Sequence, residues 1–95
     1  MNQEILEKLR ELKPVLKEKF GIEEFAVFGS VARGEDNENS DIDIAVTKAN
    51  VKDYFKLIEA KYFIEDTLKK AVDIGYFDGI RQIIKNHIQK DMINV

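Results

Sequence analysis

The residues of this sequence best suited to chemistry are Asp41 and Asp43, two positions apart in a segment of strictly alternating character. In a β-strand such side chains project from one face, about 7 Å apart given a rise of ~3.3 Å per residue. Two ionised carboxylates at this separation repel each other, and a hard divalent cation, Mg²⁺ or Mn²⁺, relieves the repulsion. The pair is a candidate metal site, although an Asp-x-Asp pair on a strand is often only a solvated face.

A third aspartate, Asp73, stands alone among apolar neighbours in a second alternating segment. Phosphoryl and nucleotidyl transfer use two cations about 3.5–4 Å apart to stabilise the attacking and leaving oxygens. Asp41 and Asp43 could bridge both ions, and Asp73 could fix the ion beside the attacking group. Asp73 could also accept the hydroxyl proton, or metal coordination alone could lower that hydroxyl's pKa enough. Its rival, Asp78, is better placed to cap the last helix.

The segment before the aspartates begins with Gly29 and Ser30, a pair that suits phosphate binding. Glycine permits a sharp turn and a close approach of backbone to phosphate, and Ser30 adds a hydroxyl and an N–H at the start of a helical turn. Arg33 supplies positive charge for the outer phosphates of a triphosphate, or merely forms a surface ion pair with Glu35 or Asp36. Gly29 alone, however, is more often simply a turn residue.

Hydrophobic spacing predicts the elements that must position these residues. Apolar residues at three- and four-residue steps predict a helix over 2–20, broken or kinked near Pro14, a helix over 51–69 capped by Asn50, and a C-terminal helix over 80–92. Tyr54, Phe55 and Tyr62 on the middle helix are expected in the core, although one could reach an adenine or a partner surface.

Shorter alternating or β-branched runs predict three strands, over 24–28, 41–46 and 71–77, with a glycine-punctuated loop over 29–40 that contains one helical turn at most. The order of elements predicts an α+β fold in which helices pack on a small mixed sheet of at least three strands.

Composition narrows the class of protein. The 95 residues fit a single domain over 1–95, and the formal charge of −3 disfavours a protein that coats extended DNA or RNA. The absence of cysteine excludes disulfides and cysteine-ligated zinc. No apolar run is long enough to span a bilayer, and the first ten residues lack the pattern of a secretory signal, so we expect no membrane association and a cytoplasmic location.

The combined motif resembles that of a known family. Gly29-Ser30, ten intervening residues, Asp41-Ile42-Asp43, and Ser40 just before the first aspartate closely resemble the DNA polymerase β-type nucleotidyltransferase superfamily. Ala32-Arg33-Gly34 lies inside the spacer, and Val72-Asp73-Ile74 matches the third strand. The spacing and short chain look most like the minimal nucleotidyltransferase (MNT) branch.

Members of that branch commonly act as antitoxins encoded beside a small helical HEPN-domain protein that resembles an RNase toxin. The resemblance implies a type VII toxin–antitoxin pair in which AMP passes from ATP to a tyrosine of the toxin. It implies that Gly29 and Ser30 hold the triphosphate and that Asp41, Asp43 and Asp73 bind two Mg²⁺ ions. Arg33 and Ser40 are further candidates for binding the triphosphate, although Ser40 is more typical of a turn residue that orders the loop. Two alternatives are a binding module that neutralises its partner without catalysis and a nucleotidyltransferase with a small-molecule acceptor.

Overall fold

The computed structural model describes residues 3–35, 41–50, 52–79 and 82–95. None of the helices in these ranges is long and apolar enough to cross a membrane. Helices and strands alternate along the chain, and their bounds are α1 (Gln3–Phe20), β1 (Ile22–Phe28), α2 (Gly29–Arg33), β2 (Ile42–Ala49), α3 (Tyr54–Leu68), β3 (Val72–Tyr76), the 3₁₀ helix η1 (Phe77–Gly79), α4 (Gln82–Gln89) and β4 (Ile93–Asn94).

The strands form one mixed sheet in the order β3-β2-β1-β4. β1 runs antiparallel to both β2 and β4, whereas β2 and β3 are parallel and are joined through α3. The mixed sheet packed by helices confirms the predicted α+β class. β4 has only two residues, too short for a hydrophobic pattern to reveal, and its register beside β1 places Ile93 opposite Val27.

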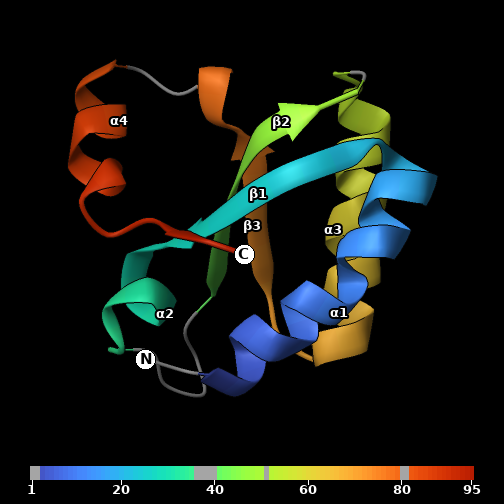
Figure 1. Cartoon of the computed structure of the whole chain (residues 1–95), viewed down its shortest axis with the longest axis horizontal. Helices are drawn as coiled ribbons and strands as arrows, with labels where there is room; N and C mark the ends of the chain where they lie inside the picture. The colour runs from blue at the N-terminus through green and yellow to red at the C-terminus, as the bar shows by residue number, and fades with distance from the viewer. Residues whose placement is uncertain (1–2, 36–40, 51, 80–81) are drawn as a thin grey trace.

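One face of the sheet carries the core. Ile42, Ile44 and Val46 alternate along β2 and are all buried, together with Val72 of β3 and Leu9 of α1. The helices α1 and α3 lie side by side over this face, as Figure 1 shows. Removal of this apolar surface from water, at ~25 cal/mol per Å², favours the fold and leaves the residues between these strand positions for the opposite face.

The sequence predicts a kink or a break of the first helix near Pro14, and the break is absent, because α1 is a single helix from Gln3 to Phe20 with the proline inside it. Leu9 and Leu16 on either side of Pro14 are both buried in the core. Their packing offsets the cost of the backbone hydrogen bond that a proline removes.

The predicted start of the middle helix is also corrected. Asp53, rather than Asn50, caps α3, and its carboxylate accepts hydrogen bonds from the N–H groups of Phe55 at 2.9 Å and Lys56 at 3.5 Å. Asn50 instead donates its backbone N–H to Gly21 at 2.8 Å, which ties the end of β2 to the start of β1. Tyr76 fixes the cap from the other side, because its hydroxyl accepts the N–H of Asp53 at 2.8 Å.

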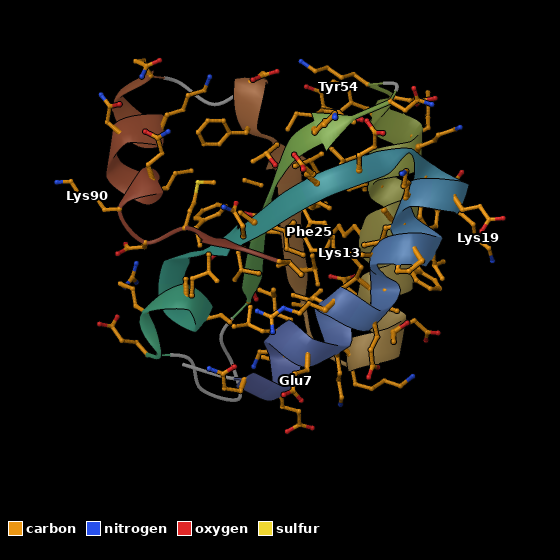
Figure 2. All side chains as sticks on the ribbon, in the orientation of Figure 1. Glu7, Lys13, Lys19, Phe25, Tyr54 and Lys90 are labelled. Atoms are coloured by element: carbon orange, nitrogen blue, oxygen red, sulfur yellow. The ribbon has the colours of Figure 1, made fainter. Side chains whose placement is uncertain are left out.

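The placement of the aromatic stripe of α3 in the core is wrong as well. Four large apolar side chains of this helix are exposed, and we call them the exposed face of α3: Tyr54 at 70%, Phe55 at 80%, Ile58 at 45% and Tyr62 at 61%. Figure 2 shows Tyr54 at the outer rim, whereas Phe25 lies in the interior. The helix buries Leu57, Ala60 and Ile64 instead, because the small Ala60 lets α3 approach its neighbours closely.

Candidate active site

The sheet brings the three aspartates to one edge. Asp43 and Asp73 are directly paired across the parallel strands β2 and β3, and Asp41 immediately precedes β2. Strand alternation places all three on the face opposite the buried Ile42, Ile44 and Val72. We call Asp41, Asp43 and Asp73 the acidic edge.

Asp43 lies at the electrostatic centre of the acidic edge. Partial burial raises the pKa of its carboxyl most, and the negative charges of Asp73 and then Asp41 raise the pKa further, whereas Arg33 opposes them by lowering it. The three carboxylates are therefore close enough to feel one another. Among the described residues, however, no three acidic or imidazole side chains are gathered tightly enough to form a ready-made metal cluster.

Gly29 lies directly against the Asp43 carboxylate. Phe28, the residue before it, pairs with Asp43 across β1 and β2, and Gly29 then turns away with φ of +74°. A Cβ added to Gly29 would fall on Oδ2 of Asp43 and lie 3.2 Å from its Cγ. Both the positive φ and this contact demand a residue without a side chain.

Ser30 begins the turn of α2 beside this carboxylate. It is half-buried, and its carbonyl accepts the N–H of Glu35 at 2.9 Å, which closes the short helix. No side chain caps the start of α2. The predicted single helical turn after Gly29 is confirmed, whereas Ser40 lies outside the described residues.

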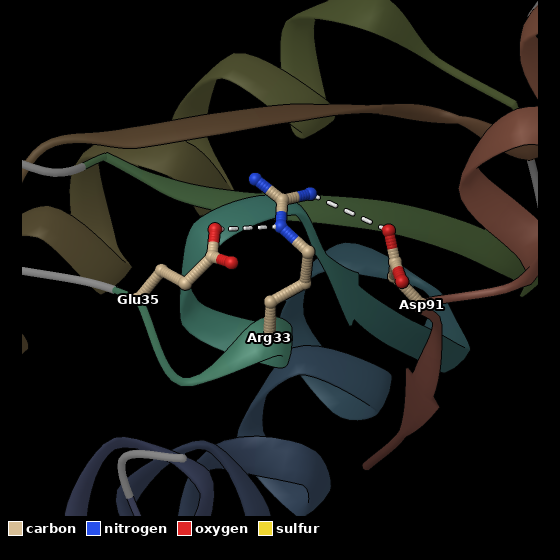
Figure 3. A network of polar contacts seen from close by, with 3 residues as sticks. All are labelled: Arg33, Glu35 and Asp91. Atoms are coloured by element: carbon tan, nitrogen blue, oxygen red, sulfur yellow. Dashed lines mark hydrogen bonds and ion pairs between the residues drawn. The ribbon is translucent and has the colours of Figure 1, made fainter.

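Arg33 ends α2 and lies between two carboxylates (Figure 3). Its Nε contacts Oε2 of Glu35 at 3.0 Å, and its Nη1 contacts Oδ2 of Asp91 at 3.4 Å. These hydrogen bonds raise the pKa of the guanidinium. The ion pair with Glu35 that the sequence offered as an alternative is present, and Asp91, far away in sequence, adds a second partner that no local pattern could reveal.

Asp78, the rival of Asp73, is engaged elsewhere. It lies in η1 and forms an ion pair with Lys52 at 2.8 Å. This hydrogen bond lowers the pKa of the Asp78 carboxyl. The start of α4, which Asp78 was expected to cap, follows residues 80 and 81, outside the described ranges.

Comparison with known proteins supplies the family. The sequence pattern of the nucleotidyltransferase domain family matches residues 9–95. The chain belongs to this family. It is 41% identical over 93 residues to a candidate protein adenylyltransferase of Methanocaldococcus jannaschii, covering 97% of this chain and 95% of that protein. It is also 34% identical to the protein adenylyltransferase MntA of Thermococcus cleftensis, over 87% of this chain and 84% of that one.

Solved structures agree on the fold. A candidate minimal nucleotidyltransferase superimposes with a TM-score of 0.80 at 30% identity, covering 100% of this chain and 97% of that one. An MNT antitoxin in complex with tri-AMPylated Shewanella oneidensis HEPN toxin superimposes with a TM-score of 0.72 over 99% of this chain and 71% of that one. Identity to that antitoxin is 21%, so it supports the fold alone. The resemblance to the minimal nucleotidyltransferases is thereby confirmed.

The acidic edge of this nucleotidyltransferase fits a divalent cation on its own chemistry. Its donor set consists only of carboxylate oxygens, which hard cations such as Mg²⁺ prefer. Partial burial and two neighbouring like charges disfavour the ionised form of Asp43, and a cation would relieve both costs. The space above Gly29 is held open for the Asp43 carboxylate by the missing side chain.

A cleft that the sequence did not predict lies beside the candidate active site. It has a volume of about 350 Å³ and lies between α3 on one wall and β3 with η1 on the other. Asp73 is among the lining residues, which links the cleft to the acidic edge, and Ile58 and Lys61 line it from α3. The sequence signal for this cleft was the stripe of Tyr54, Phe55 and Tyr62 on α3, which hydrophobic spacing places in the core.

Proposed function

We propose that this nucleotidyltransferase transfers AMP from ATP to a tyrosine of a HEPN-type RNase toxin and thereby acts as the antitoxin of the pair. The observation that carries the proposal is the in-register pairing of Asp43 with Asp73, beside a Gly29 that cannot bear a side chain. The chain covers nearly all of a candidate protein adenylyltransferase and most of the adenylyltransferase MntA. They support a protein as the acceptor.

In this proposal Asp41, Asp43 and Asp73 would hold two Mg²⁺ ions, with Mn²⁺ as a substitute. The ions supply positive charge that stabilises the attacking and leaving oxygens of an in-line displacement. The backbone of Gly29 and Ser30 would hold the triphosphate, because no described side chain caps the N–H groups at the start of α2. Ser40 and Arg33 are proposed to assist binding of the phosphates.

The proposed transfer balances as follows. The phenolic oxygen of the acceptor tyrosine forms a bond with the α-phosphorus of ATP, and the bond from that phosphorus to the oxygen bridging the α- and β-phosphates breaks. Pyrophosphate leaves with the electron pair of the broken bond. The phenolic proton passes to a carboxylate oxygen of Asp73, which is exposed and can release it to water. The chain's own contribution is thus to position the phosphates and the attacking hydroxyl and to accept a proton.

The choice of partner rests on the family resemblance and on one structural relative. The MNT antitoxin whose fold this chain shares is bound to an AMPylated HEPN toxin. The acceptor for this chain is therefore proposed to be a HEPN-domain protein encoded beside it.

The decisive experiment combines the purified chain, its neighbouring HEPN protein, Mg²⁺ and ATP, and detects AMP on tyrosine by mass spectrometry. The rate of transfer should fall in each of the variants Asp41→Asn, Asp43→Asn and Asp73→Asn, because the neutral amide does not replace the negative charge of the carboxylate. For Asp41→Asn and Asp43→Asn we expect a loss of about a thousandfold or more. Asp66→Asn is the matched control, since Asp66 is an exposed carboxylate paired with Lys69 on α3. Full transfer by Asp41→Asn and Asp43→Asn would refute the assigned site.

A second candidate function is neutralisation by complex formation alone, favoured by the exposed face of α3. Growth rescue separates the two. Under the catalytic proposal Asp43→Asn fails to protect cells that express the toxin, whereas under simple complex formation Asp43→Asn protects as well as the natural sequence does.

A further inference from the structure

The exposed face of α3 is unusual for so small a chain. Tyr54, Phe55, Ile58 and Tyr62 are each 45% to 80% exposed, although the same helix buries Leu57 and Ile64 fully or nearly so. From Tyr54 to Tyr62 the helix rises about 12 Å at ~1.5 Å per residue. Contiguous exposed apolar side chains, aromatic ones above all, mark surfaces that bind another protein. An apolar surface of this length is larger than the contact that a single nucleotide base needs.

This surface is continuous with the candidate active site. Ile58 and Tyr54 belong to the exposed face and also line the cleft of about 350 Å³ between α3 and β3. Asp73 lines the same cleft and is paired in register with Asp43. A molecule that covers the exposed face and fills the cleft therefore reaches the acidic edge from the side of Asp73.

The β3 wall of the cleft offers backbone groups that suit a polypeptide. β3 is the last strand of the sheet, next to β2 on one side only. The carbonyl of Ala71 accepts the N–H of Ile42 at 2.9 Å, whereas the N–H of Val72 points the other way and donates to Glu65 Oε2 at 2.9 Å. Backbone groups alternate in direction along a strand, so those of Ile74 face the open edge as Val72 does. Such an edge can bond to the main chain of a partner.

The cleft also has a rigid frame. At one end the hydroxyl of Tyr76 bonds to the backbone of Asp53, and the rings of Tyr54 and Tyr76 meet edge to face with centroids 5.8 Å apart. At the other end Glu65 holds Val72. Because both ends tie α3 to β3, the cleft exists before a ligand arrives, which lowers the entropic cost of binding.

We propose that the exposed face of α3 and the adjoining cleft form the docking surface for the protein that carries the acceptor tyrosine, with the tyrosine entering beside Asp73. This inference rests on the proposed function, since it takes its partner from there. Lys56, Glu59 and Lys61 provide a charged rim around the apolar side chains, an arrangement typical of protein interfaces. In the proposed function the nucleotide is held at Gly29 and Ser30, beside Asp43, whereas the cleft is lined by Asp73.

The test measures binding of the neighbouring HEPN protein by isothermal titration calorimetry. Ile58→Arg, and separately the double variant Phe55→Arg with Tyr62→Arg, should weaken this binding at least tenfold, because charged side chains replace apolar contacts. The affinity for ATP with Mg²⁺ should change less than twofold. The double variant replaces only the two side chains that are 80% and 61% exposed, so its circular dichroism melt should match that of the parent.

A matched control adds the same charge elsewhere. Asn86→Arg with Gln89→Arg alters two exposed positions of α4 and should leave partner binding unchanged. Unaltered partner binding by the α3 variants would overturn the inference, as would a parallel loss of ATP affinity, which would assign the cleft to the nucleotide. A natural chain that is dimeric by light scattering, and that the α3 variants render monomeric, would assign the surface to a second copy.

Binding and transfer are separate readouts. If the natural chain binds the HEPN protein without transferring AMP, the proposed function fails while the docking surface is still tested by calorimetry. If transfer occurs and the α3 variants bind and transfer normally, only the docking surface is wrong.

Discussion

Two groups of charged side chains lie near the two ends of α2, and their charges are balanced in opposite ways. At the end of α2, Arg33 has carboxylates at 3.0 Å and 3.4 Å, so opposite charges are paired. Beside the start of α2, the acidic edge gathers like charges, and burial and these neighbours raise the pKa of Asp43. The first arrangement ties α2 to the segment before β4. The second opposes folding at neutral pH because like charges repel, and a bound cation would relieve that repulsion.

The ion pairs at Arg33 serve the fold, whereas the like charges of the acidic edge serve binding. If this distinction is correct, removing charge from the acidic edge stabilises the chain and abolishes function, whereas removing charge at Arg33 changes stability little. The position that joins the two groups is Gly29, because it starts α2 and also contacts Asp43.

Gly29→Ala should give the largest loss of stability. The added methyl group would collide with the Asp43 carboxylate, and alanine at a φ of +74° costs about 1–2 kcal/mol before that collision is counted. We expect the free energy of unfolding to fall by about 1–3 kcal/mol and AMP transfer to fall with it. Thermal melts followed by circular dichroism measure the first effect.

Gly79→Ala is the control for this prediction. A Cβ at Gly79 meets no atom within 4 Å, and this glycine has no positive φ. Its melting temperature should therefore match that of the parent within about 2 °C. Equal melting temperatures for Gly29→Ala and Gly79→Ala would show that the contact with Asp43 is not tight.

Asp43→Asn should have an intermediate effect of opposite sign. Asparagine resembles the protonated carboxyl, so it removes the repulsion from Asp73 and Asp41. Without divalent cations at neutral pH, we expect a rise in melting temperature of about 2–5 °C, or roughly 0.5 kcal/mol. Magnesium should then stabilise the natural chain more than the variant, because a ligand stabilises only the form that binds it.

The pH dependence gives the sign of this effect independently. The pKa of Asp43 is raised in the folded state above its ordinary value of 3.8, so the folded chain holds this proton more tightly than the unfolded chain does. The stability that protonation of Asp43 contributes is fully present below its pKa in the unfolded chain. It is lost as pH rises through its pKa in the folded chain. The gain from Asp43→Asn should therefore shrink as pH falls from 7 toward the unfolded value of 3.8, and it should be absent below that value. A constant difference between pH 3 and pH 7 would contradict the repulsion.

Much of the acidic edge follows from local sequence. The alternation around Asp43 fixes which face its side chain takes, and the single charge between Val72 and Ile74 identifies its counterpart on β3. The pairing of Asp43 with Asp73 was not in the sequence, because it depends on the parallel register of β2 and β3. Hydrophobic spacing states which side chains share a face, not which strands are neighbours.

Spacing also failed where a helix has two apolar stripes. Tyr54, Phe55 and Tyr62 form a stripe as regular as that of Leu57, Ala60 and Ile64, and the larger side chains were assigned to the core. The fold buries the smaller set because Ala60 permits close packing. Residue type predicts Asn50 as the cap, but its backbone N–H donates to the carbonyl of Gly21 instead. Such tertiary contacts have no signature in the local sequence.

Arg33→Gln and Asp91→Asn should give the smallest effects on stability. Both side chains of the pair are about one-third exposed or more, so the pair is screened by water, and each variant should shift the melting temperature by no more than about 3 °C. A double-mutant cycle with both substitutions measures their coupling. A double variant whose shift in melting temperature differs from the sum of the two single shifts by more than about 8 °C would contradict the view that the contact at Arg33 is a modest surface tether.

The same variants decide whether Arg33 binds phosphate as well. Asp91→Asn releases one of the two carboxylates that hold the guanidinium, so it leaves more positive charge for a triphosphate. If Arg33 binds the outer phosphates, Asp91→Asn should tighten ATP binding by about twofold and Arg33→Gln should weaken it by about tenfold. Arg33→Gln also removes the cation that lowers the pKa of Asp43. For that reason ATP affinity is measured over a range of pH, and the chains are compared where the affinity of each no longer changes with pH. Unchanged ATP affinity in both variants would leave Arg33 a role in tethering α2 alone and would place the phosphates entirely on Gly29, Ser30 and the ions of the acidic edge.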